Sequence, residues 1–82
     1  MKTRINKFVV ENAFIKFASN IAKYDVRDDD ICDYVSHLNT HKQSSNLHLF
    51  IVIVMRTQRE YFVFMNYDTL MQRANVIQIA QS

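Results

Sequence analysis

The chain has 82 residues, with ten Lys and Arg against eight Asp and Glu and a formal net charge of +2. Hydrophobic residues make up 49% and charged residues 22%, which is ordinary globular composition and excludes an intrinsically disordered chain. Glycine and proline are both absent, so glycine-dependent phosphate-binding loops, dinucleotide fingerprints and EF-hand loops are excluded as well.

The length and the cysteine content limit the architecture and the compartment. A chain of this size builds one core, so we expect residues 1–82 to form a single domain. Cys32 is the only cysteine, which excludes an intramolecular disulfide and favours a reducing compartment. The longest apolar run, residues 47–55, has nine residues, whereas a membrane-spanning helix needs about 20. With no signal-peptide pattern at the N-terminus, we expect a cytoplasmic protein without direct membrane insertion.

The first predicted element is an amphipathic helix over residues 6–24. Apolar side chains recur along it at alternating steps of four and three, at Val10, Phe14, Phe17, Ile21 and Tyr24. Ala13 and Ala18 widen this stripe.

An acidic cluster follows, formed by Asp25, Asp28, Asp29, Asp30 and Asp33. Ile31, Tyr34, Val35 and Leu38 recur at helical spacing through and after it, which predicts a second amphipathic helix. An early aspartate would cap its N-terminus, and His37, His41 and Lys42 would suit its C-terminal dipole. Residues 39–46 are polar and predict a loop.

The next segment predicts a β-hairpin. Residues 47–55 are rich in β-branched side chains, residues 56–60 are polar, and residues 61–65 are aromatic and aliphatic. Because no glycine is present, we expect a type I turn or a longer bend.

The C-terminal segment predicts a third helix, capped by Asn66 or Asp68 and ending near Asn75. Leu70, Met71 and Ala74, extended by Ile77, would share one face. Residues 76–80 alternatively predict a short terminal strand, because they are mostly β-branched. The predicted fold class is therefore α+β: two N-terminal amphipathic helices, a β-hairpin and a C-terminal helix, with a short terminal strand as the alternative at the end.

Both faces of the predicted hairpin are apolar. Alternate residues of a strand point to opposite faces, yet residues 47–55 are apolar on both, apart from His48. A small chain readily covers one face of a hairpin. We expect the other face to be covered by a second copy of the chain, by a different protein, or by the third helix. We predict a partner-binding surface formed by Phe50, Val52, Val54, Arg56, Arg59, Tyr61, Phe62 and Phe64.

Side chains capable of catalysis or metal binding are few. His37 and His41 are four residues apart, as in some metal sites, but no third ligand has a suitable spacing. Cys32 and His37 would point to different sides of one helix, and Asp28–Asp30 lacks a glycine-containing calcium loop. We expect no catalytic residue, no metal and no cofactor, and therefore no enzyme.

Basic residues support an alternative. Lys2, Arg4 and Lys7 near the N-terminus and Arg56 and Arg59 at the hairpin tip would form a phosphate-contacting surface. On this interpretation the chain is a small nucleic-acid-binding regulator.

The glycine-free, Asn-rich composition with one cysteine, which includes the segment IVIVMRTQREYFVFMNYDTL, resembles the small accessory proteins of large lytic phages. The lysis-inhibition proteins of T-even phages are similar in size. This resemblance implies a cytoplasmic antiholin that binds a holin and delays lysis, and it carries over no functional residue. We therefore expect a regulatory or inhibitory protein that binds a protein target, forms a homodimer, or does both, with nucleic acid as the alternative partner.

Overall fold

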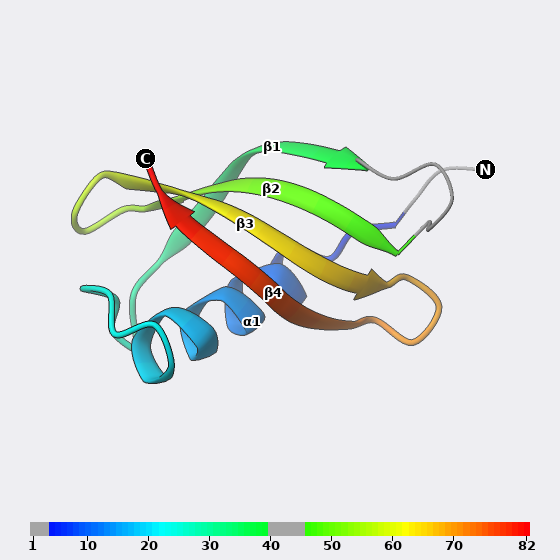
Figure 1. Cartoon of the computed structure of the whole chain (residues 1–82), viewed down its shortest axis with the longest axis horizontal. Helices are drawn as coiled ribbons and strands as arrows, with labels where there is room; N and C mark the ends of the chain where they lie inside the picture. Colours follow the sequence, from blue (N-terminus) through cyan, green and yellow to red (C-terminus); the bar gives the residue numbers. More distant parts are fainter. Residues whose placement is uncertain (1–3, 40–45) are drawn as a thin grey trace.

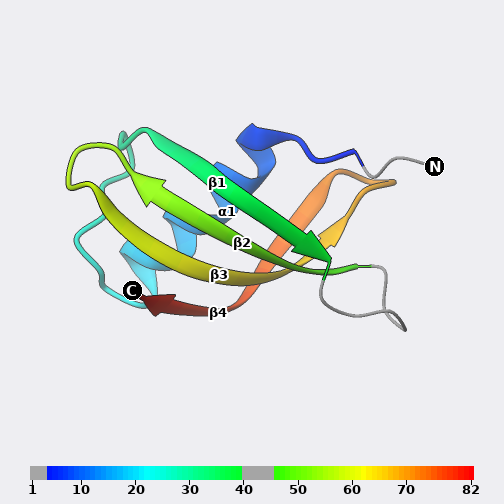
Figure 2. The same cartoon turned by 90° about the horizontal axis from the view of Figure 1, so that it is seen from above.

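The computed structural model describes residues 4–39 and 46–82. It contains one helix and four strands, in the order α1 (Lys7–Asn20), β1 (Cys32–Asn39), β2 (Leu47–Val54), β3 (Arg59–Asp68) and β4 (Arg73–Gln81). The strands form one antiparallel sheet in the order β1-β2-β3-β4, so β1 and β4 are its edges. α1 packs against one face of this sheet, which gives a molecule of two layers (Figures 1 and 2).

The first predicted helix is present but shorter than expected. Its start is set by Asn6, whose side-chain oxygen accepts a hydrogen bond from the Phe8 backbone N–H at 2.9 Å. Its end is marked by Lys23, which has a left-handed φ of 59°, and by the Tyr24 N–H, which donates to the carbonyl of Ala18 at 2.9 Å. Residues 21–24, the last part of the predicted helix, therefore belong to the connection that leads to β1.

The core lies between α1 and the inner face of the sheet. α1 contributes Val10, Phe14, Ile15 and Ala18, all of them buried. Every second residue of the central strands meets them, because strand side chains alternate between faces. These buried strand residues are Phe50, Val52 and Val54 of β2 and Tyr61, Val63, Met65 and Tyr67 of β3.

The second predicted helix is wrong, because residues 32–39 form the edge strand β1. β1 pairs with β2, and its register shifts between Tyr34 and Ser36. This bulge inserts Val35, so the inward-facing residues are Cys32, Tyr34 and His37, at steps of two and then three. Tyr34 and Val35, neighbours in the predicted helical stripe, therefore point to opposite faces of the sheet, and pairing with β2 decided the conformation.

The third predicted helix is also wrong. β3 continues to Asp68, a turn follows, and β4 spans Arg73–Gln81, so the alternative of a terminal strand describes this segment better. Asp68 does act as a cap, but its carboxylate accepts the N–H groups of Leu70 and Met71 at 3.0 and 3.1 Å and closes the β3–β4 turn. A second bulge in the β3–β4 ladder, at Ile77, disturbs the alternation here too. Mixed α and β content is thus correct, while the predicted arrangement of elements is not.

The predicted hairpin is present as β2 and β3, with Val54 opposite Arg59 across a turn of four residues. In this turn Gln58 adopts a left-handed φ of 60°, and its N–H donates to the Val54 carbonyl at 2.7 Å. The left-handed conformation that glycine usually provides is therefore taken by an ordinary residue.

Part of the predicted polar loop at residues 39–46, including His41 and Lys42, lies outside the described residues, as does Lys2. Within the described part of the chain, no helix has both the length and the hydropathy needed to cross a bilayer.

Candidate functional site: an open sheet face

The face of the sheet that points away from α1 is apolar. It presents five side chains of the two central strands, which we call the open sheet face: Leu49, Ile51 and Ile53 of β2 and Phe62 and Phe64 of β3. Cross-strand pairing places Leu49 beside Phe64 and Ile51 beside Phe62. Among residues 4–39 and 46–82 no helix covers this face, and the Phe62 residue is 39% exposed.

Two bulges extend the open sheet face toward the sheet edges. Val35 follows the inward-facing Tyr34 in β1, and Ile77 follows the inward-facing Val76 in β4, so alternation directs both outward. They are 57% and 51% exposed. Contiguous exposed apolar surface of this kind is uncommon on a monomer and is typical of interaction sites.

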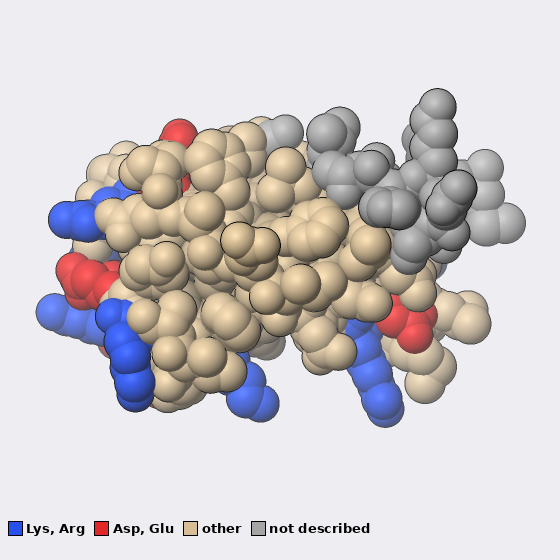
Figure 3. All heavy atoms as spheres, viewed as in Figure 1, with Lys and Arg blue, Asp and Glu red and all other residues tan. Residues whose placement is uncertain are grey.

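Charged residues lie at the margins of this surface. Asp33 and Glu60 lie on either side of Ile53 at one end of the sheet, and Asp68 lies opposite Arg73 in the β3–β4 ladder at the other end. In the space-filling view the centre of the surface over the strands is free of charged side chains, which gather around its periphery (Figure 3). An apolar centre with a charged rim is the usual anatomy of a protein interface.

The structure divides the eight residues predicted to bind a partner. Phe50, Val52, Val54 and Tyr61 face α1 and are at most 1% exposed, so they belong to the core. Phe62 and Phe64 lie on the open sheet face. Arg56 and Arg59 lie at the β2–β3 turn, beyond the end of this face. Partner binding by any of the eight stays a prediction.

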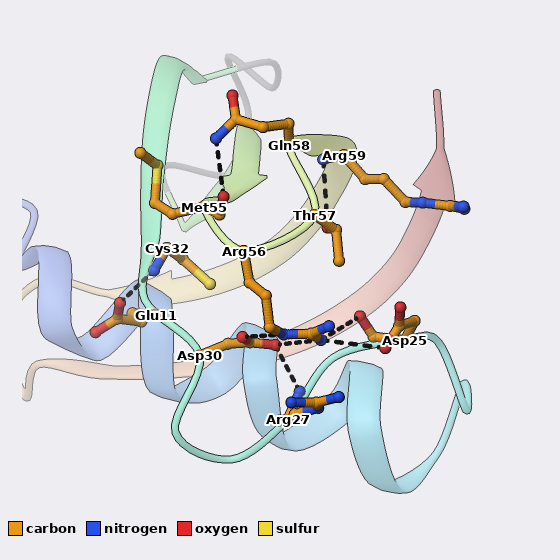
Figure 4. A network of polar contacts seen from close by, with 10 residues as sticks. All are labelled: Glu11, Asp25, Arg27, Asp30, Cys32, Met55, Arg56, Thr57, Gln58 and Arg59. Carbon is orange, nitrogen blue, oxygen red and sulfur yellow. Dashed lines mark hydrogen bonds and ion pairs between the residues drawn. The ribbon is translucent and has the colours of Figure 1, made fainter.

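Arg56 is held by carboxylates of the connection between α1 and β1 (Figure 4). Its Nε donates to Asp30 Oδ1 at 2.7 Å and its Nη2 to Asp30 Oδ2 at 2.9 Å, a bidentate ion pair. The same Nη2 donates to Asp25 Oδ1 at 3.1 Å. The charge of Arg56 is therefore already neutralised within the chain.

Asp30 is the centre of this network. Its residue is 8% exposed, and Oδ2 also accepts the Arg27 backbone N–H at 2.7 Å. The hydrogen bonds from Arg56 hold the pKa of Asp30 below its usual value of 3.8, with burial opposing them. Asp30, a member of the acidic cluster expected to cap and precede a helix, thus anchors the β2–β3 turn.

His37 and His48 form a pair at the β1–β2 side of the core. His37 Nε2 and His48 Nδ1 are 2.7 Å apart, and the two rings stack with centroids separated by 4.9 Å. Burial, together with the proximity of His48, lowers the pKa of His37 below 6.5. Residues 4–39 and 46–82 contain no cluster of three or more His, Cys, Asp or Glu side chains suited to a metal ion.

Cys32 is a core residue at the start of β1 and is 2% exposed. Its backbone N–H donates to Glu11 Oε2 on α1 at 2.8 Å. Burial raises the pKa of its thiol to about 12, so the reactive thiolate is scarce at neutral pH.

The predicted basic surface is not assembled by the residues that the structure describes. Lys7 pairs with Asp33 at 3.4 Å, and Arg56 is bound as above. Arg4 lies beside the β3–β4 turn, because its carbonyl accepts from Gln72 Nε2 at 3.4 Å. Arg59 begins β3 at the opposite end of the sheet. These cations do not form one patch.

Sequence reasoning missed Leu49, Ile51 and Ile53 as surface residues. It found two apolar faces on the hairpin and drew the predicted surface from both, because it took the covered face of β2 together with Phe62 and Phe64 from the open face of β3. One available signal was the turn: four residues between Val54 and Arg59 place Phe62 on the same face as Ile51. No local sequence pattern indicates which of the two hairpin faces α1 covers.

No known protein family matches this chain, and no curated protein or solved structure is significantly similar to it.

Proposed function

We propose that this chain acts by protein–protein binding and not by catalysis, and that its open sheet face packs against a second copy of the chain. The observation that supports this proposal is the uncovered apolar surface of Leu49, Ile51, Ile53, Phe62 and Phe64. Burying such a surface is worth about 25 cal/mol for each Å² removed from water.

The size of the face is sufficient for a dimer of modest affinity. Four strands about 4.8 Å apart and about 8 residues long present roughly 500 Å² on one face. Two such faces in contact bury about 1,000 Å² in total, which is near the lower limit of specific interfaces. We therefore expect a dissociation constant in the micromolar range.

The charges at the rim favour one orientation of the two copies. Glu60 and Arg73 lie on the outward side at opposite ends of the sheet. A two-fold axis that lies in the interface and crosses the strands places Arg73 of each copy over the Asp33 and Glu60 end of the other. The alternative axis, parallel to the strands, would bring the acidic ends together, and like charges across an interface oppose binding.

Sedimentation velocity tests the proposal. We expect the wild-type chain to be mainly dimeric at about 100 μM, and Phe62→Glu to be monomeric because it buries a charge at the centre of the interface. The matched control is Phe8→Glu, the same change at a 67% exposed position of α1, which should leave the dimer intact. Far-UV circular dichroism verifies that both variants are folded.

A wild-type chain that stays monomeric at millimolar concentration would contradict the proposal, as would a dimeric Phe62→Glu. A regulatory or inhibitory role, including the antiholin role that the resemblance implies, would use binding of this kind and stays a prediction.

A further inference from the structure

A shallow groove runs between α1 and the edge strand β4. It consists of two adjoining depressions, of about 380 and 390 Å³, that share Ala13 and Lys16 of α1 and Ala74 and Asn75 of β4. Among the strands, β4 makes the most extensive backbone contact with the helix. The groove lies at the edge of the sheet, so face-to-face packing of two copies leaves it accessible.

The groove has an apolar wall at the margin of the core. Phe17 of α1 and Ile21, just after the helix, line one side, and Val76 of β4, which also packs against the core, lines the other. Phe17 and Ile21 continue the predicted apolar stripe of the helix, yet Phe17 is only partly buried and Ile21 is 66% exposed. These side chains are apolar surface directly beside an edge strand.

The charges of the groove have one sign. Lys16 and Arg73 are the charged side chains that line the two depressions, and no carboxylate lines either of them. Neither cation forms an ion pair with a described residue. An occupant with acidic side chains would therefore be attracted to this groove.

The outer edge of β4 offers backbone hydrogen bonds. An edge strand leaves alternate N–H and C=O groups without a neighbouring strand. Within the described residues, the backbone bonds of β4 go to β3. The bulge at Ile77 interrupts its geometry, so the regular stretch beside the groove is residues 73–76.

From these four features we infer that β4 and the groove form a second binding site, which takes an extended acidic peptide segment of another protein as a fifth strand. The peptide backbone pairs with residues 73–76. Its alternate apolar side chains enter the groove against Phe17, Ile21 and Val76. The acidic side chains between them point to the opposite face of the added strand, on the side where Arg73 lies, and Lys16 in the groove attracts them over a longer distance. Strand addition of this kind combines backbone affinity with side-chain specificity. The site lies at the edge of the sheet and not on the open sheet face, and Arg73 borders both.

The probe is an acetylated eight-residue peptide in which Val and Asp alternate. Titrated into the isotopically labelled full chain, it should shift the backbone amide resonances of residues 13–21 and 73–76, with a dissociation constant on the order of 100 μM. The same peptide with Lys in place of Asp should bind about tenfold or more weakly, because it repels Lys16 and Arg73.

Two N-methylated peptides test the strand pairing. Methylation of the alternate amides that face β4 should abolish binding, whereas methylation of the other alternate set should preserve it, because only one set donates to β4. Equal binding by both peptides, or no amide shifts at millimolar peptide, would overturn the inference. Shifts of the β4 amides with protein concentration alone would also overturn it, by showing that a second copy occupies this edge.

Variants of the chain locate the site. Lys16→Glu should weaken binding of the acidic peptide about tenfold, and Lys23→Glu, the same change at an exposed position outside the groove, should not. Phe62→Glu should bind the acidic peptide as tightly as the wild type does. The peptide titration therefore tests this site separately from the proposed dimer. An equal loss in Lys16→Glu and Lys23→Glu would contradict a located site.

Discussion

At the level of single residues, the absence of glycine forces ordinary residues into an unfavourable backbone conformation at three positions of the described chain. Lys23, Gln58 and Gln72 adopt left-handed φ values of 59°, 60° and 54°. Such a conformation costs an ordinary residue about 1 kcal/mol or more, because Cβ approaches the carbonyl oxygen. The side chains of Gln58 and Gln72 offset part of this cost by donating to the carbonyls of Met55 and Thr69, at 2.8 and 2.7 Å.

Lys23 makes no such side-chain bond to a described residue, so a substitution there tests the backbone strain directly. We expect Lys23→Gly to raise the free energy of unfolding by about 0.5–1 kcal/mol, since glycine adopts this φ without strain. Urea denaturation measures the change. The control is Lys16→Gly, the same substitution inside α1, which should lower stability by about 1 kcal/mol. A loss of stability in both variants would contradict strain at Lys23.

The His37–His48 pair makes stability depend on pH. The pKa of His37 is lowered in the folded state, so the unfolded chain binds the proton more readily. The neutral His37 side chain contributes its full share to the free energy of unfolding above about pH 6.5. Below that value the free energy of unfolding decreases by up to about 1.4 kcal/mol for each pH unit. Urea denaturation at pH 7.5, 6.5 and 5.5 should show this slope, and His37→Gln should flatten it. An unchanged slope in the variant would refute the assignment.

At the scale of elements, two connections hold each other in place. The β2–β3 turn carries Arg56, and the connection between α1 and β1 carries Asp25 and Asp30 (Figure 4). The Met55 N–H adds a backbone bond to the Ile31 carbonyl at 2.9 Å. The glycine-free turn is therefore fixed by contacts with a distant segment in addition to its own hydrogen bonds.

Asp30→Asn should loosen this arrangement. The change removes the charge that Arg56 binds, so we expect a lower melting temperature and faster hydrogen exchange at the amides of Met55 and Gln58. Because the pKa of Asp30 is lowered, its contribution is complete above pH 3.8 and is lost as the pH falls through the folded-state pKa. Asp29→Asn, an exposed neighbour, is the control, and an equal effect in both variants would count against the ion pair.

At the scale of the whole molecule, one helix and four strands make two layers, and two layers leave a sheet face without cover. α1 covers the inner face of the two central strands, where Phe50 is 0% exposed, as is Phe14 of α1. The opposite face has no covering helix in the described residues and keeps its aliphatic and aromatic side chains at the surface. The proposed dimer uses this open sheet face, and the proposed peptide site uses the edge strand β4 and the groove beside it.

Several features follow from the sequence alone. The amphipathic period of the first helix and the β-branched runs of the hairpin reflect local preference, and the structure contains that helix and that hairpin. The two apolar faces of residues 47–54 were also evident, because alternation needs no tertiary information.

The remaining features depend on tertiary pairing and packing. Residues 32–39 and 73–81 are strands because β2 and β3 offer their backbones as partners, and the bulges at Val35 and Ile77 interrupt the two-residue alternation that would have indicated a strand. Which hairpin face is covered depended on the side where α1 packs. Phe50 and Phe62 are equally apolar in the sequence, and only the position of the helix makes one core and the other surface.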